Sequence, residues 1–120
     1  MTASFNSEDL NYELLLAGDD ALSRAVTIAQ GQTLARGAVV GRITASGKYV
    51  LSAAAAVDGS QVPDAVVAEA VDAAAADTDG LVYIRGDFAE SGLILGAGQT
   101  LDGIREGLRL KDIYLIAVGA

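Results

Sequence analysis

The stretch DGSQVPDAVVAEAVDAAAAD, residues 58–77, decides the fold class because it can be interpreted as a helix or as a strand. Its alanines favour a helix over residues 65–76. Two features oppose that helix: no polar face is broad enough to mark a surface helix, and four valines cluster at or near its start. The valines are Val62, Val66, Val67 and Val71.

The strand interpretation rests on alternation and on the residues that follow. In a strand, the side chains of Val67 and Val71 point to one face and that of Val66 to the other. The next run, LVYIRGDF at 81–88, has the β-branched and aromatic content of a strand. We therefore predict a strand from residue 65 to about residue 73, paired in a hairpin with residues 81–88. The turns that bound these strands are expected at residues 58–59, 63–64 and 77–80.

The residues between 23 and 52 have the pattern of short strands separated by glycine-containing turns. Residues 25–29 form the first expected strand. Residues 39–43 and 48–51 are expected to form a hairpin around a turn at residues 46–47.

One helix is predicted near the C-terminal end. Leu101, Ile104 and Leu108 recur at helical spacing, and Thr100 before them is a suitable N-cap. Residues 113–118 are then expected to form a final strand that is apolar on both sides and buried. The chain is therefore predicted to be mainly β with little helix.

The charge of the chain restricts its partners. Eight basic residues stand against sixteen acidic ones, which gives a formal net charge of -8. Such a chain repels the phosphate backbone of nucleic acids and the surface of an anionic membrane. We expect neither nucleic acid nor membrane as a partner.

Missing residue types restrict the chemistry. The chain has no cysteine and no histidine, so it lacks the commonest zinc ligands and the side chain best suited to proton transfer near neutral pH. No metal or cofactor is expected. The longest uncharged runs, such as residues 25–35, are shorter than the roughly 20 residues of a membrane helix. The first residues lack the pattern of a secretion signal, so we expect a soluble cytoplasmic product.

Several short motifs resemble functional sites but fail on spacing. SGK at 46–48 lacks the other residues of a phosphate loop, and GAG at 96–98 lacks the third glycine of a dinucleotide fingerprint. DTDG at 77–80 lacks the first and last ligands of a calcium loop. Carboxylates such as Asp87 and Glu90 could pair as acid and base, but nothing in the sequence singles them out. We predict no enzymatic activity.

Several short segments follow one another in a fixed order: VTI at 26–28, GQ at 31–32, RG at 36–37, VVG at 39–41, SGKY at 46–49, DGSQ at 58–61, RGDF at 85–88 and IYL at 113–115. This ordered set resembles the head decoration proteins of tailed bacteriophages, the lambda-type capsid-stabilising family. The resemblance implies a small mainly β domain of the β-clip kind with one or two short helices. It also implies homotrimers that bind the major capsid protein shell on the outside of the expanded head, at local threefold positions. Made in the host bacterial cytoplasm, such proteins stabilise the virion against the pressure of packaged DNA, and no catalytic residue is carried over.

The first residues are unlike the rest, and the resemblance implies that they form an arm that becomes ordered against the shell. We expect an arm over residues 1–22 and a β-clip-like decoration domain over residues 23–120. An alternative is that Leu14–Leu16 form an edge strand of the domain itself. The apolar side chains that could bind the shell are Tyr12, Leu14, Leu15 and Leu16, with Phe5 and Leu10 second.

A competing function is a β-clip or half-barrel module that binds a small ligand such as a sugar acid. That module predicts a saturable small-molecule site and a dispensable N-terminal segment. The capsid-binding interpretation predicts the reverse.

Overall fold

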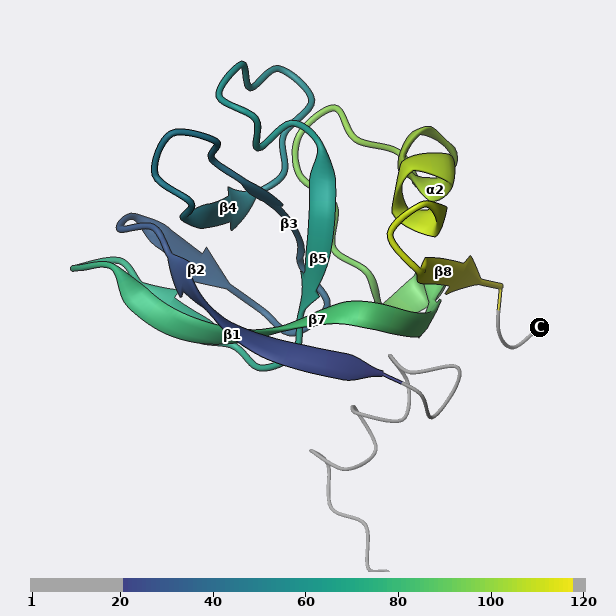
Figure 1. Ribbon diagram of the computed structural model, residues 1–120, viewed down its shortest axis with the longest axis horizontal. Helices are drawn as coiled ribbons and strands as arrows, with labels where there is room; N and C mark the ends of the chain where they lie inside the picture. The colour runs from purple at the N-terminus through teal and green to yellow at the C-terminus, as the bar shows by residue number, and fades with distance from the viewer. Residues whose placement is uncertain (1–20, 118–120) are drawn as a thin grey trace, which may run out of the picture.

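The structure is a computed structural model, and it describes residues 21–117 (Figure 1). The described residues are mainly β, with one short 3-10 helix and one α-helix, which confirms the predicted fold class. The elements are β1 Leu22–Ile28, β2 Gln32–Leu34, β3 Val39–Arg42, β4 Tyr49–Leu51, β5 Pro63–Val67, β6 Val71–Ala73, β7 Thr78–Ala89, η1 Glu90–Gly92, α2 Leu101–Arg109 and β8 Ile113–Ile116.

The main sheet of the described part closes on itself. Its strand order is β1-β4-β3-β5-β7-β8, and β1 also pairs with β7. Strand β1 is parallel to β4 and antiparallel to β7, with Ile28 opposite both Tyr49 and Thr78. The ring from β1 to β7 is therefore barrel-like, and it leaves β8 at the end of the strand order.

The deciding stretch forms strands, as predicted, but it is interrupted. Strand β5 begins at Pro63, and bends at residues 68–69 separate it from β6. Strand β5 pairs with β3 and β7, whereas β6 pairs with β2 in a separate two-stranded sheet. The predicted turn at residues 63–64 is wrong, because a proline is tolerated at the first position of a strand.

The predicted turn at residues 77–80 is also largely wrong. Strand β7 begins at Thr78 and includes Gly80, and these residues pair with Ile28 and Val26 of β1. A Cβ on Gly80 would lie 2.9 Å from Cγ1 of Ile28, so the glycine allows the two strands to meet. Long-range pairing overrides local turn propensity here.

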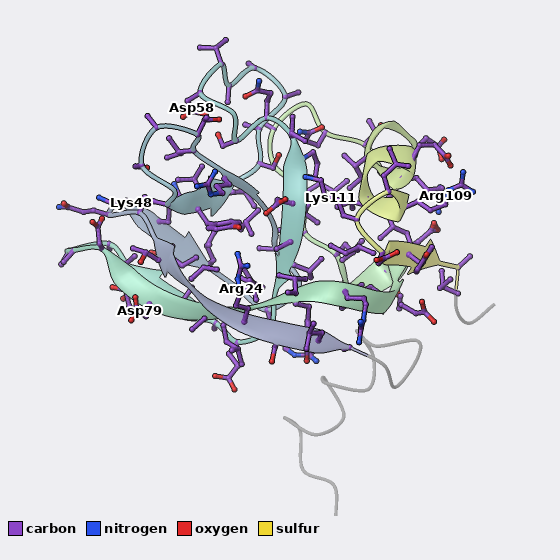
Figure 2. All side chains as sticks on the ribbon, viewed as in Figure 1. Arg24, Lys48, Asp58, Asp79, Arg109 and Lys111 are labelled. Carbon is purple, nitrogen blue, oxygen red and sulfur yellow. The ribbon has the colours of Figure 1, made fainter. Side chains whose placement is uncertain are left out.

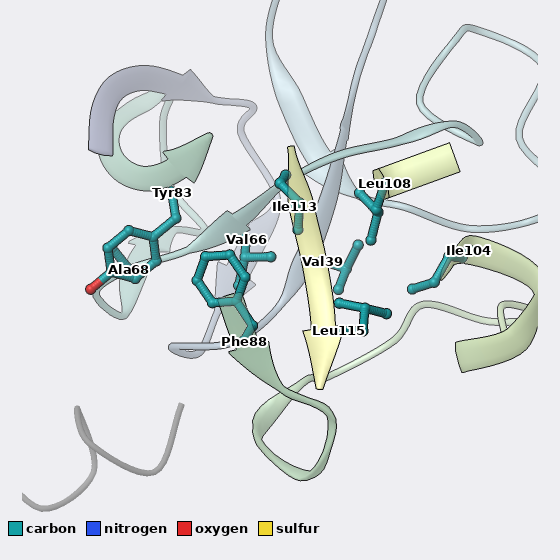
Figure 3. Close-up of a cluster of buried hydrophobic side chains, with 9 residues drawn as sticks. All are labelled: Val39, Val66, Ala68, Tyr83, Phe88, Ile104, Leu108, Ile113 and Leu115. Carbon is teal, nitrogen blue, oxygen red and sulfur yellow. The ribbon is translucent and has the colours of Figure 1, made fainter. Parts of the chain in front are cut away.

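The described residues contain two hydrophobic clusters, and β3 and β5 contribute to both. Val66 belongs to a cluster with Phe88, Leu108 and Ile113, drawn in Figure 3, while its neighbour Val67 belongs to the other. Successive strand residues point to opposite faces, so both faces of β5 are covered. Burial of both faces explains why the sequence of β5 is almost continuously apolar.

The remaining predictions are mostly confirmed. Strands β3 and β4 form the expected antiparallel hairpin. Helix α2 begins after Thr100, whose side chain accepts a hydrogen bond from the Gly103 N–H at 3.0 Å. Strand β1 begins at Leu22, one residue before the expected domain boundary. The expectation that the last strand is buried on both sides is wrong, because Tyr114 and Ile116 are exposed.

Candidate functional site

The six apolar residues predicted to bind a partner lie outside the described residues. These are Phe5, Leu10, Tyr12, Leu14, Leu15 and Leu16. The structure does describe Ala21, where the N-terminal segment joins the domain. Ala21 packs against the cluster of Figure 3, and its Cα would lie 3.1 Å from a Cβ placed on Gly86 of β7. Ala21, the first described residue, therefore lies at the surface around Gly86.

A polar hollow of about 280 Å³ lies at this place. It is formed where β8 joins β7: the Gly86 N–H donates to the carbonyl of Asp112 at 3.0 Å, and Asp112 has a positive φ of 63°. The Tyr114 hydroxyl donates to the Asp112 carboxylate at 3.4 Å. The hollow is lined by Arg85, Gly86, Asp87, Asp112 and Tyr114.

Exposed apolar side chains lie close to the hollow. Leu22, Tyr114 and Ile116 are 44%, 39% and 38% exposed. Leu22 is the register partner of Arg85, and Tyr114 is that of Asp87, so both lie beside residues that line the hollow. Sequence reasoning missed Tyr114 and Ile116 because β8 is apolar at every position and has no alternation to show which face is exposed.

The other face of β8 is fixed to the domain. Ile113 and Leu115 are buried in the cluster with α2. The Arg105 guanidinium donates to the Leu115 carbonyl at 3.2 Å and to the Glu90 carboxylate at 2.7 Å. This contact ties η1, α2 and β8 together, so the exposed face is presented by a firmly held strand.

A second polar network ties β1, β4 and β5 to the turn before β8. The Asp64 carboxylate accepts hydrogen bonds from Lys111 Nζ at 2.7 Å and from the Tyr49 hydroxyl at 2.8 Å. Arg24, which is labelled in Figure 2, donates from Nη2 to the Tyr49 hydroxyl at 3.4 Å. Burial opposes the charge of Asp64, but the hydrogen bonds from Lys111 and Tyr49 outweigh it and lower its pKa. Burial, together with Asp64, raises the pKa of Tyr49.

Several segments that resemble functional motifs in the sequence have structural roles in the fold. Asp77 forms an ion pair with Lys48 at 2.6 Å and accepts a hydrogen bond from the Gln30 N–H at 2.8 Å. Gly47 has a positive φ of 75° in the turn between β3 and β4. Glu90, considered as a partner of Asp87, is bound to Arg105 instead.

The described residues hold no further chemical machinery. Between residues 21 and 117, no group of three or more acidic residues is placed to hold a metal ion. No helix in that range is long and apolar enough to cross a membrane. The hollow lies just below the size range of small-molecule pockets, and four of the five residues that line it are polar or charged.

Comparison with known proteins shows which family the sequence matches. The sequence model of the family described as "Bacteriophage lambda head decoration protein D" matches residues 4–108. That range covers most of the chain and includes both the N-terminal segment and the barrel. No curated protein matches the chain.

Proposed function

This chain belongs to the bacteriophage lambda head decoration protein family, and from that membership we propose that it cements the expanded head of a tailed phage. The role of the family is capsid decoration, and its place is the virion. The finer proposal is that the chain binds the outer capsid surface as a homotrimer at local threefold positions. There it stabilises the shell against the pressure of packaged DNA.

One observation carries this proposal: the family match extends from residue 4, so the N-terminal segment belongs to the matched sequence together with the domain. We propose that residues 1–22 form the arm and residues 23–120 the decoration domain. The arm joins the domain beside exposed Leu22, Tyr114 and Ile116. These side chains extend the apolar surface of the arm onto the domain, so both can face the shell together.

Ordering the arm against the shell has a cost that apolar burial must offset. Fixing one backbone residue costs about 1–2 kcal/mol, while burying a leucine side chain contributes about 1.5–3 kcal/mol. Tyr12, Leu14, Leu15 and Leu16 are the strongest contributors, followed by Phe5 and Leu10. An extended arm that adds a strand to a capsid sheet would gain main-chain hydrogen bonds as well.

In a trimer, three arms that each bind the shell weakly can together bind it tightly. Once one arm is bound, the effective concentration of the other two at neighbouring sites rises to about the millimolar range for short linkers. A shell that has not expanded lacks the paired surfaces, so binding distinguishes the maturation states of the head.

The test of the arm is the double variant Leu14→Asp/Leu16→Asp. Two carboxylates at apolar contacts remove the burial that offsets ordering, so we expect a normal circular dichroism spectrum and melting temperature with loss of sedimentation on expanded heads. The matched control is Ser7→Asp/Asn11→Asp, which adds the same charge to the segment but keeps its apolar side chains. It should still bind.

Two other results would contradict the proposed arm. Undiminished binding of Leu14→Asp/Leu16→Asp would show that these leucines do not contact the shell. Unfolding of that variant, with the control folded, would show that Leu14–Leu16 belong to the domain as its own edge strand.

A further inference from the structure

We propose that copies of this chain associate through the sparsely charged surface formed by the β4–β5 loop, residues 52–62, and the segment before α2, residues 95–100, in which Asp58 is the one charged residue. The inference rests on the proposed homotrimer and names the surface through which it forms. We call this surface the loop face.

Charge restricts where copies can meet. Each chain carries a net charge of -8, so most pairings of two surfaces bring like charges together. Like charges placed opposite each other in a contact are strongly unfavourable. Residues 49–57 and 91–101 contain no charged residue. A contact between copies is least opposed where these two uncharged segments form one surface.

The structure brings the two segments together. The Ala54 N–H donates to the Ala97 carbonyl at 2.9 Å. The Gln99 side-chain amide donates to the Gln61 carbonyl at 2.9 Å and to the Ser52 hydroxyl at 3.2 Å. A Cβ on Gly96 would overlap the Ser52 carbonyl, so the two backbones are in direct contact. The loop face is therefore continuous although its segments are far apart in the sequence.

The loop face is also held in a fixed shape. Ser52 and Ser60 are buried at its base, and the Ser52 hydroxyl donates to the Ser60 carbonyl at 2.7 Å. Asp58 accepts hydrogen bonds from the N–H and the hydroxyl of Ser60 at 3.0 and 2.6 Å. A preorganised loop loses little conformational entropy when it binds.

The loop face exposes apolar side chains. Val57 is 94% exposed and Val62 is 50% exposed, and the small residues Ala54, Ala55 and Ala97 are exposed around them. Leu110 is nearly as exposed, at 85%, but it lies between Arg109 and Lys111. The one charged residue of the loop face, Asp58, is hydrogen-bonded to Ser60, whereas Leu110 is flanked by two basic residues.

The position of the loop face suits a second copy. In Figure 1 the β4–β5 loop and the strand β1 lie on opposite sides of the domain. Asp58 is labelled in this loop in Figure 2, far from Asp79 at the other side. Contacts between copies on the loop face therefore leave the surface around Ala21 free for the shell.

Cross-linking tests the inference directly because the chain has no cysteine of its own. In the variant Val57→Cys, a short flexible bismaleimide should join copies into covalent pairs, both on expanded heads and in concentrated solution. The matched control is Leu110→Cys, which places an equally accessible thiol outside the loop face and should give few pairs. Equal cross-linking of the two variants, or none at Val57→Cys, would overturn the inference.

A second variant separates this inference from the proposed function. Val57→Asp should weaken self-association by about tenfold or more in sedimentation velocity, because it brings new carboxylates together at the contact. Unchanged association would overturn the inference. If the unmodified chain is retained on heads but Val57→Cys gives no pairs there, the loop face is wrong and capsid binding stands. If the unmodified chain is not retained on expanded heads, capsid binding itself is wrong.

Discussion

At the scale of single residues, Asp64 joins several parts of the fold through one carboxylate. Its two oxygens accept from Lys111, in the turn before β8, and from Tyr49 of β4, while Asp64 itself lies in β5. Tyr49 is almost fully buried and receives a hydrogen bond from Arg24 of β1. The network therefore holds β1, β4 and β5 of the barrel to the turn before β8.

Replacing Asp64 by Asn should lower the free energy of unfolding by about 1–2 kcal/mol at neutral pH, because it removes hydrogen bonds to a charged group. Urea denaturation measures this change. The matched control is Asp77→Asn, which breaks the more exposed pair with Lys48 and should have little effect, as surface ion pairs contribute little. An equal effect of the two substitutions would contradict the role given to Asp64.

The difference in the free energy of unfolding between the wild type and Asp64→Asn should depend on pH. The pKa of Asp64 is lowered in the folded state from its ordinary value of 3.8, so its contribution is present above that value and is lost as the pH falls through the folded-state pKa. The difference between the wild type and Asp64→Asn should therefore shrink in acid. A difference that stays constant down to about pH 2 would contradict this assignment.

At the scale of elements, glycines decide how closely the segments of the barrel approach. A Cβ on Gly41 of β3 would overlap the Ser60 carbonyl at the end of the β4–β5 loop. Gly107 of α2 has no atom within 4 Å of such a Cβ. The first glycine is required by packing, whereas the second only weakens its helix.

The two glycines should respond oppositely to alanine. Gly41→Ala should destabilise the protein by about 1–3 kcal/mol, because the backbone must move to relieve the overlap. Gly107→Ala should stabilise it by up to about 1 kcal/mol through helix propensity alone. Thermal unfolding of both variants checks this, and a stable Gly41→Ala variant would show that the approach of the β4–β5 loop is looser than described.

An element can be predicted from the sequence when the residues that it pairs with lie close to it in the chain. The hairpin of β3 and β4 and the capped helix α2 are determined by residues close in sequence, and both were predicted correctly. The bend between β5 and β6 and the early start of β7 depend on β2 and β1, which lie far away in the chain. Turn propensity at residues 77–80 could not reveal those partners.

The candidate site was less predictable than the fold. Exposure of Tyr114 and Ile116 follows from α2 covering only one face of β8, and the apolar sequence of β8 carries no sign of it. The hollow depends on the junction of β7 and β8 around Gly86 and Asp112, which are 26 positions apart. The apolar residues of the N-terminal segment remain a prediction, since they lie outside residues 21–117.

At the scale of the whole molecule, two surfaces are proposed for two partners. We propose that the surface around Ala21, with the arm, faces the capsid shell, and that the loop face meets other copies. The net charge of -8 opposes the association of free copies, so they associate only at high concentration. Binding to neighbouring sites on a shell would raise their local concentration and favour the sparsely charged contact.

The most direct measurement is co-sedimentation of the purified protein with expanded and unexpanded heads of its own phage, assembled without it. We predict retention on expanded heads alone, saturating at a fixed ratio to the capsid subunits, with cooperative uptake. Equal retention on both kinds of head would contradict recognition of the expanded shell, and no retention on either would contradict the cementing role itself.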